Sequence, residues 1–159
     1  MLRSRVLNLF LTLFSSLLFF SADFFLKKYI LANFLPNKPY SLIGNVVVLR
    51  LVYNRGAAFG ILQGKTFFLI FVGIIFLIFF LVWIARARFS WKELGFLGMI
   101  LGGALSNLYD RIFLGAVVDY IDLRFWPIFN LSDTFISLGC LFLLIGYFKQ
   151  AKCKRKVLE

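Results

Sequence analysis

The stretch FFLIFVGIIFLIFFLVWIA, residues 67–85, holds no charged residue and approaches the ~20 residues that a helix needs to cross a bilayer. Three more apolar runs, at about 6–26, 94–112 and 131–148, lie on either side of it. Hydrophobic residues make up 62% of the sequence, against roughly 45–50% in soluble domains. We therefore predict an all-α membrane protein that forms one domain, residues 1–159, with four transmembrane helices.

Basic residues predict the orientation of these helices. They gather before the first apolar run, in the short turn between the second and third, and in the tail that begins at Lys149. The two remaining connections, about 27–66 and 113–130, are longer and poorer in basic residues, although six lie in 27–66. Because lysine and arginine favour cytoplasmic loops, we expect both termini in the cytoplasm and these two connections on the outer face.

Two alternatives concern the N-terminus and the net charge. The first 23 residues look like a cleavable signal peptide, but the apolar run is long and bulky Phe20 would stand three residues before a cut after Ala22. We therefore expect a retained helix. The net charge of +11 would suit nucleic-acid binding, but no motif for it is visible. We assign the charge to membrane orientation and to contact of the tail with anionic lipid.

The acidic residues are distributed unevenly. All five aspartates fall at the expected outer ends of helices or in the outer connections: Asp23, Asp110, Asp119, Asp122 and Asp133. A charged side chain at the centre of a membrane helix costs ~2.5–3.5 kcal/mol on insertion scales. Five carboxylates near one face of a hydrophobic protein therefore predict a functional site.

Individual aspartates also have purely structural explanations. Asp133 is placed to cap a helix, since Asn130 and Ser132 beside it are typical capping residues. Asp110 can pair with its neighbour Arg111, and Asp122 can be solvated. These explanations are favoured for any one aspartate alone, whereas a site is favoured for all five together.

The outer connections contain segments that favour extended structure. Residues 46–54 are rich in β-branched side chains, and residues 116–123 follow the same pattern. We predict a small β-rich cap in the first outer connection, followed by a turn with an apolar piece at 54–64. In a strand Asp119 and Asp122 point to opposite faces, so at most one of them can face a shared site.

The third apolar run is rich in small residues: Gly95, Gly98, Gly102, Gly103 and Ala104. Such residues let helix backbones approach closely in a membrane. We expect them to serve packing, and thereby to hold the polar ends of the helices in register.

The residue inventory restricts the possible chemistry. The sequence has no histidine, which excludes serine–histidine triads and histidine-bound zinc. Cys140 and Cys153 have no spacing typical of a metal site or a disulfide, so we expect no metal and no cofactor. Carboxylate chemistry remains: two close aspartates that share one proton can activate water and polarise a carbonyl group.

Three motifs together resemble one enzyme family. They are YNRGAAFG (53–60), SNLYDRIFLGAVVDYID (106–122) and FNLSD (129–133). In order, spacing and expected topology they are similar to bacterial lipoprotein signal peptidases, also called type II signal peptidases. The resemblance extends from Asp23 to Asp133. Each motif alone is weak, but the combination is specific.

The resemblance implies an aspartic endopeptidase of the bacterial cytoplasmic (inner) membrane, with its active site at the outer face. Such enzymes remove the signal peptide from prolipoproteins and cut before a cysteine that carries a diacylglyceryl group. Asp119 and Asp133 match the catalytic pair. The residues that match supporting positions are Asp23, Lys27, Asn54, Gly56, Asn107, Asp110, Arg111 and Asn130.

The resemblance also implies partners and a mechanism. Lipid-modified prolipoproteins and membrane lipid are the expected partners, with cyclic peptide antibiotics such as globomycin as inhibitors; nothing demands more than a monomer. One aspartate of the pair would take a proton from water, and the other would donate a proton to the scissile carbonyl oxygen. Which aspartate holds the proton is left open, because the pair titrates as a unit.

Some positions depart from the family pattern. Ser106 stands where glycine is common, Ser132 stands where alanine is common, and residues 24–26 are apolar where polar residues often follow Asp23. We expect these differences to affect substrate preference or inhibitor fit, and to leave the chemistry intact.

Two other functions are compatible with outer-face aspartates. A small ion or proton transporter also uses acidic residues within the membrane, but transport sites lie near the midplane and these aspartates lie at one end. A non-enzymatic assembly factor would use them as docking charges. The motif combination favours the peptidase over both.

Overall fold

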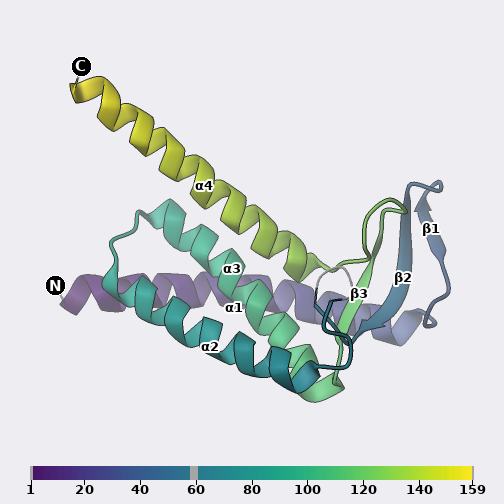
Figure 1. Cartoon of the computed structure of the whole chain (residues 1–159). Helices are drawn as coiled ribbons and strands as arrows, with labels where there is room; N and C mark the ends of the chain where they lie inside the picture. Colours follow the sequence, from purple (N-terminus) through teal and green to yellow (C-terminus); the bar gives the residue numbers. More distant parts are fainter. Residues whose placement is uncertain (1, 58–60, 159) are drawn as a thin grey trace.

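The computed structural model describes residues 2–57 and 61–158, with side-chain surroundings for 5–57, 61–149 and 151–152. That part contains the helices α1 (Leu2–Asn33), α2 (Thr66–Arg86), α3 (Trp91–Leu114) and α4 (Leu131–Leu158), and the strands β1 (Tyr40–Ile43), β2 (Val47–Asn54) and β3 (Val117–Asp122). The strands lie at one end of the helical bundle, and both chain termini lie at the other (Figure 1).

Some predictions fall partly outside the described residues. The side chains of Arg3 and of residues 153–156, which contribute to the predicted orientation, lie outside the described part. Residues 58–60 of the predicted apolar turn also lie outside it.

Within the described residues, three segments are long and apolar enough to cross a membrane: Arg5–Asn33, Thr66–Arg86 and Leu131–Lys149. Helix α3 is not among them. Among the side chains that the structure describes, α3 has more buried positions than the other helices, including Leu97, Leu101 and Asn107. Much of its surface therefore meets protein and need not be apolar. The all-helical bundle is confirmed, whereas the fourth crossing stays a prediction.

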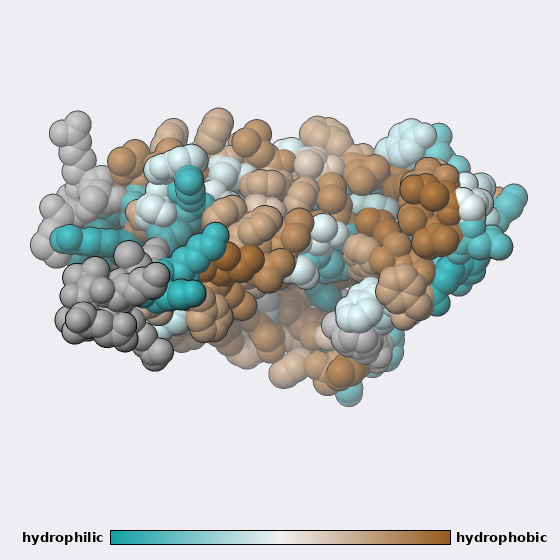
Figure 2. Space-filling model, turned by 90° about the horizontal axis from the view of Figure 1, so that it is seen from above, coloured by the Kyte–Doolittle hydropathy of each residue, from teal (hydrophilic) through white to brown (hydrophobic). Residues whose placement is uncertain are grey.

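The bundle presents an apolar exterior. Large hydrophobic side chains such as Phe10, Leu17 and Phe79 are 60–70% exposed. Soluble monomeric proteins rarely expose such a large apolar surface to water. Apolar side chains cover the middle of the molecule, and polar ones gather at the sheet end and at the opposite end (Figure 2). This distribution is typical of a protein embedded in a membrane.

Small residues allow close packing around α3, as predicted. A methyl group at Gly102 would lie 2.5 Å from the Ser16 carbonyl oxygen of α1, and one at Gly103 would lie 2.6 Å from the Ser132 carbonyl oxygen of α4. A methyl group at Gly98 would also meet α1, whereas one at Gly95 would meet no other part of the protein within 4 Å. Two faces of α3 therefore touch the backbones of two other helices, α1 and α4. The contact with α4 is made at Ser132, in the first turn of that helix.

Local sequence signals define both ends of α3. Ser90 and Glu93 form a capping box at its start. Gly115 ends the helix in the left-handed conformation, with φ 73°, which glycine adopts without strain. The chain then enters β3 directly, so the position of α3 determines where β3 begins.

Helices α1 and α4 are longer than predicted. The first outer connection was expected from residue 27, but α1 continues to Asn33 because its last turns are covered by the sheet. Ile30 packs in a buried cluster with Leu51, Val118 and Tyr120. Helix α4 continues past the predicted end at 148 to Leu158, and no proline or glycine interrupts that segment.

The sheet has the order β1-β2-β3, with antiparallel neighbours. Strands β2 and β3 confirm the two predicted extended segments, while β1 was not predicted. Asp119 lies opposite Val52 and Asp122 lies opposite Val48. As expected, the two aspartates have different surroundings: Asp122 pairs with Arg50, at 3.2 Å.

Candidate active site

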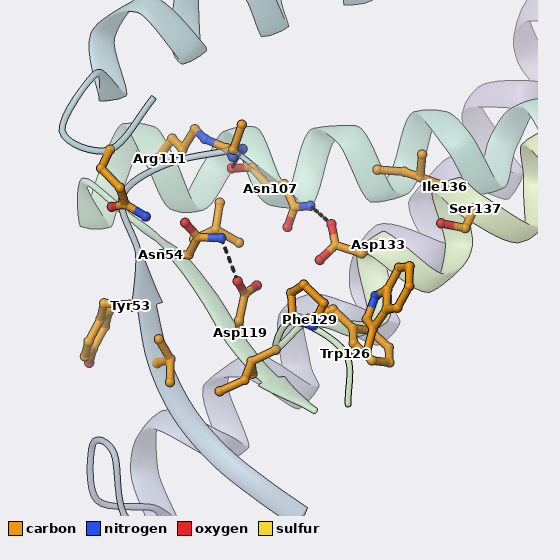
Figure 3. Close-up of a pocket in the computed structure, with 16 residues that line it drawn as sticks. Tyr53, Asn54, Asn107, Arg111, Asp119, Trp126, Phe129, Asp133, Ile136 and Ser137 are labelled. Carbon is orange, nitrogen blue, oxygen red and sulfur yellow. Dashed lines mark hydrogen bonds between the residues drawn. The ribbon is translucent and has the colours of Figure 1, made fainter. Parts of the chain in front are cut away.

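A pocket of about 720 Å³ lies where the sheet meets the helices. Residues of β2, β3, α3, α4 and the segment 126–129 line it. Among them are Asp119 and Asp133, whose carboxyl groups are directed into the same space (Figure 3). The predicted pair therefore meets in one cavity, although its two members come from a strand and a helix.

Asp133 lies in the first turn of α4 and serves two purposes. Its backbone N–H donates to Asn130 Oδ1 at 2.9 Å, and its Oδ2 accepts from the Asn130 backbone N–H at 3.2 Å. This reciprocal arrangement is a helix cap, so the structural explanation of Asp133 is correct for one carboxylate oxygen. The other oxygen, Oδ1, accepts from Asn107 Nδ2 at 2.8 Å at the pocket wall.

Asp119 receives one amide donor on each oxygen. Asn130 Nδ2 donates to Oδ1 at 2.8 Å, and Asn54 Nδ2 donates to Oδ2 at 2.9 Å. Asp119 is only 3% exposed. Both donors hold the carboxyl plane in place and leave its remaining lone pairs available to a ligand.

The orientation of each of these three amides is determined by a group that can only donate. Asn54 Oδ1 accepts from the Gly56 backbone N–H, and Asn130 Oδ1 accepts from the Asp133 backbone N–H. Asn107 Oδ1 accepts from the Lys27 ammonium at 3.0 Å. The NH₂ group of each asparagine must therefore face the carboxylates, which makes the amide frame around the pair unambiguous.

Burial and charge alter the acidity of Asp119. Burial in apolar surroundings raises the pKa of its carboxyl group from 3.8 to about 7; the hydrogen bond from Asn54 opposes the rise and the charge of Asp133 adds to it. At neutral pH the group is therefore close to half protonation. This is the state that a carboxylate pair with one shared proton requires.

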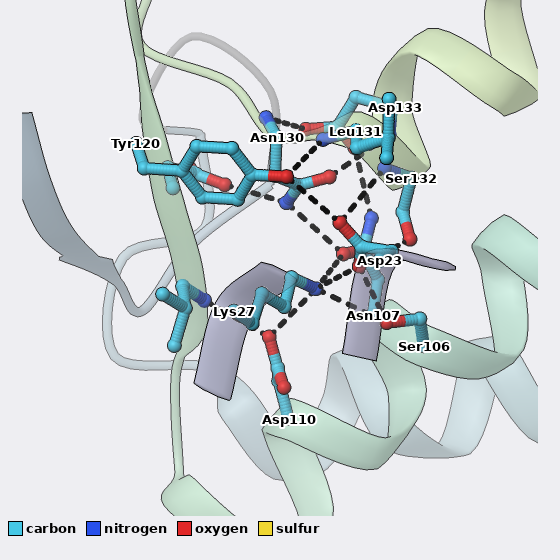
Figure 4. Close-up of polar contacts among 12 residues, drawn as sticks. Asp23, Lys27, Ser106, Asn107, Asp110, Tyr120, Asn130, Leu131, Ser132 and Asp133 are labelled. Carbon is cyan, nitrogen blue, oxygen red and sulfur yellow. Dashed lines mark hydrogen bonds and ion pairs between the residues drawn. The ribbon is translucent and has the colours of Figure 1, made fainter. Parts of the chain in front are cut away.

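A buried ionic cluster lies behind the pocket. Lys27 is 3% exposed, and its Nζ lies 2.8 Å from Asp23 Oδ2 and 2.8 Å from Asp110 Oδ2. Asp110 Oδ2 also accepts from the Val118 backbone N–H at 3.0 Å, next to Asp119. The cluster connects α1, α3 and β3 (Figure 4).

Arg111 and Gly56 arrange the chain that leaves β2. Arg111 donates to the Gly56 carbonyl at 3.2 Å and to the Asn107 carbonyl at 3.3 Å. A methyl group at Gly56 would lie 2.7 Å from the Ile61 carbonyl oxygen, so the turn requires glycine. This turn keeps Asn54 in contact with Asp119.

The structure brings all the predicted site residues into one region. Those that line the pocket are Asn54, Asn107, Arg111, Asp119 and Asp133; those behind it are Asp23, Lys27, Gly56, Asp110 and Asn130. Their roles in catalysis stay predictions.

Other contacts were not anticipated from the sequence. Tyr120 Oη donates to Asp23 Oδ1 at 3.1 Å and accepts from the Leu131 backbone N–H at 3.0 Å. The one feature of the sequence that could have indicated these contacts is a tyrosine between two aspartates in an otherwise apolar segment. Ser106 and Ser132 were expected to affect substrate or inhibitor fit, but neither is among the residues that line the pocket.

Comparisons with known proteins agree with this architecture. The family model described as signal peptidase (SPase) II, Peptidase_A8, matches residues 15–149. The chain is 43% identical to the lipoprotein signal peptidase of Syntrophomonas wolfei over 75% of this chain and 80% of that protein. It is 38% identical to the lipoprotein signal peptidase of Halothermothrix orenii over 82% of this chain and 90% of that protein.

Solved structures point the same way. One bacterial membrane enzyme determined by the in meso method has a TM-score of 0.84 and 27% identity, and covers 90% of each chain. A second has a TM-score of 0.78 and 28% identity over 87% of this chain and 92% of that chain. The transporter alternative finds no support among these relatives. The chain therefore belongs to the signal peptidase II family and is an aspartic peptidase of the membrane.

Proposed function

We propose that this chain removes signal peptides from diacylglyceryl-modified prolipoproteins, with Asp119 and Asp133 as the catalytic pair. The observation that carries the assignment is the amide-bridged pair of carboxyl groups at one pocket wall. Asn130 Nδ2 donates both to Asp119 Oδ1 and to Asn107 Oδ1, and Asn107 Nδ2 donates to Asp133 Oδ1. The names of the relatives support the choice of substrate.

The chemistry follows from one proton shared by two carboxyl groups. The ionised member removes a proton from a water molecule, and the resulting hydroxide attacks the scissile carbonyl carbon. The protonated member donates to the carbonyl oxygen, so the tetrahedral intermediate carries no full negative charge. When the C–N bond breaks, the leaving nitrogen takes the proton that came from water. One hydroxyl group of the intermediate returns its proton to the other carboxylate as the C=O bond re-forms, so the pair regains its single shared proton.

We infer a membrane placement that suits a lipidated substrate. All four helices cross the membrane within a single domain, both termini are cytoplasmic, and the sheet covers the outer ends of the helices in the bacterial cytoplasmic membrane. The pocket at the sheet end supports this placement, because acyl chains in the bilayer would present the peptide bond at that level. The same pocket is the proposed binding site for globomycin-like peptides, and the protein acts as a monomer.

The decisive experiment compares three isosteric substitutions in purified protein with a diacylated precursor peptide. Asp119→Asn and Asp133→Asn should each abolish release of the signal peptide, because neither variant can share a proton between two carboxyl groups. Asp122→Asn is the matched control: Asp122 is on the same strand as Asp119 but pairs with Arg50 outside the pocket. Cleavage at the wild-type rate by either of the first two variants would refute the assignment.

A further inference from the structure

Two serine hydroxyls from different helices converge on one buried carboxylate oxygen. Ser106 Oγ of α3 and Ser132 Oγ of α4 both lie 2.6 Å from Asp23 Oδ2 of α1. Asp23 and Ser132 are 0% exposed, and Ser106 is 1% exposed. The three helices therefore meet at a single atom behind the pocket.

The direction of these hydrogen bonds follows from the surrounding charges. The Lys27 ammonium lies 2.8 Å from the same oxygen, so Asp23 is ion-paired and its oxygen can only accept. Each serine must donate, and the short distances are typical of an O–H group that donates to a carboxylate. The other oxygen, Oδ1, accepts from Tyr120 Oη and from the Ser132 backbone N–H at 3.3 Å. Removal of one hydroxyl thus removes a donor from a buried charged group.

A short path leads from this carboxylate to Asp133. The Lys27 ammonium contacts Asp23 and Asp110 and donates to Asn107 Oδ1 and Ser106 Oγ. With fewer donors on Asp23, the ammonium would be drawn toward that carboxylate and away from Asn107 Oδ1. Asn107 would then lose one of the two contacts that turn its NH₂ group toward Asp133 Oδ1, and only the donation from Asn130 Nδ2 would remain.

A second path runs through the backbone of α4. Ser132 directly precedes Asp133, and both its hydroxyl and its backbone N–H donate to Asp23. The first turn of α4 is therefore held from α1 at the residue beside the proposed catalytic group. Ser106 likewise directly precedes Asn107, the residue that donates to Asp133.

We propose that Ser106 and Ser132 form a paired clamp on Asp23 that positions Asp133 for catalysis. They are positioning residues, because neither lines the pocket. The inference rests on the proposed function, since it assumes that Asp133 is one of the catalytic pair. It assigns to the two serines a role in turnover instead of the role in substrate or inhibitor fit expected from the sequence.

The test uses Ser106→Ala, Ser132→Ala and the double variant, each purified as the full chain in detergent. The rate constant kcat per folded protein, KM for a diacylated precursor peptide, and the pH profile of kcat are measured. Ser16→Ala is the matched control, because Ser16 is also a buried helical serine, 3% exposed, but its hydroxyl donates to the Leu13 carbonyl within α1.

We expect each clamp variant to lower kcat roughly tenfold, as small displacements of catalytic groups do, with KM within about twofold. The acid limb of the pH profile should move to higher pH, because Asp133 loses a donor that favours its ionised form. The titratable and charged groups around Asp133 are Asp23 and Lys27 from α1, Arg111 from α3, and Asp119 and Tyr120 from β3; all of them are retained. Ser16→Ala should leave all three quantities unchanged.

Two results would overturn the clamp. One is a wild-type kcat and pH profile in both serine variants. The other is a fall in activity that matches loss of folded protein, with an unchanged profile, which would mean that the serines only stabilise the fold. Parallel assays of Asp119→Asn and Asp133→Asn separate the two proposals. If these are inactive and the serine variants are normal, only the clamp fails; if they are active, the proposed pair fails.

Discussion

The buried carboxyl group of Asp119 should make the folded protein less stable as pH rises, and Asp119→Asn should remove this dependence. Its pKa rises from 3.8 to about 7 on folding, chiefly through burial. At about 1.4 kcal/mol for each pKa unit, this shift corresponds to a change of about 4 kcal/mol in the free energy of unfolding.

The sign follows from proton uptake. Between about pH 4 and pH 7 the folded protein holds a proton at Asp119 that the unfolded chain has lost, so the folded state is the one that binds more protons. The contribution of this group is fully present below about pH 4, declines across the interval and is lost above about pH 7. The wild-type protein should therefore lose about 4 kcal/mol of stability from pH 4 to pH 8 that the asparagine variant keeps.

The substitution also has a cost that does not depend on pH. Asn54 and Asn130 each donate to one oxygen of Asp119, and an asparagine has only one oxygen. One N–H group is left facing another donor, which costs about 1–3 kcal/mol. The variant should therefore be less stable than the wild type at pH 4 and more stable at pH 8.

The measurement is equilibrium unfolding in detergent micelles at pH 4, 6 and 8, followed by tryptophan fluorescence. Ser137→Ala serves as the control, because Ser137 lines the same pocket but carries no charge, and its curve should parallel that of the wild type. Parallel pH curves for the wild type and Asp119→Asn would refute the explanation and would mean that Asp119 does not hold its proton to near neutral pH.

Other parts of the fold yield further predictions. Lys27→Met should lower the free energy of unfolding by about 3–5 kcal/mol, because it leaves two buried carboxylates without their cation. Lys28→Met, at the exposed neighbouring lysine, should change the free energy of unfolding little. If denaturation showed equal losses of stability in the two variants, the buried ion pairs of Lys27 would not have this stabilising role. Gly103→Ala should destabilise by about 1–3 kcal/mol because its methyl group would press on the Ser132 carbonyl, whereas Gly95→Ala, in open space, should be neutral or stabilising in the same measurement. Reporter fusions should place the C-terminus in the cytoplasm and an insertion at Gly44 outside; the same side for both would exclude four crossings.

The helices and the site differ in how far sequence could predict them. Apolar runs are local, and their length alone identified α2 and the cores of α1 and α4. The true end of α1 was missed, because it depends on burial of Ile30 against Leu51, Val118 and Tyr120, which lie far away in the chain. Strand β1 was missed for the same reason, since its partner β2 defines it.

Residue types and motif order determined much about this protein: a membrane-embedded helical bundle, an aspartic peptidase, and Asp119 and Asp133 as its proposed pair. Apolar length, missing histidine and motif spacing are properties of the chain itself, so no coordinates are needed to read them. Only the tertiary structure decided how the amide groups face the two carboxyl groups, and that Ser106 and Ser132 both donate to Asp23. Such contacts join different helices and strands and require polar atoms to lie within about 3 Å of one another, which happens only when these elements pack together.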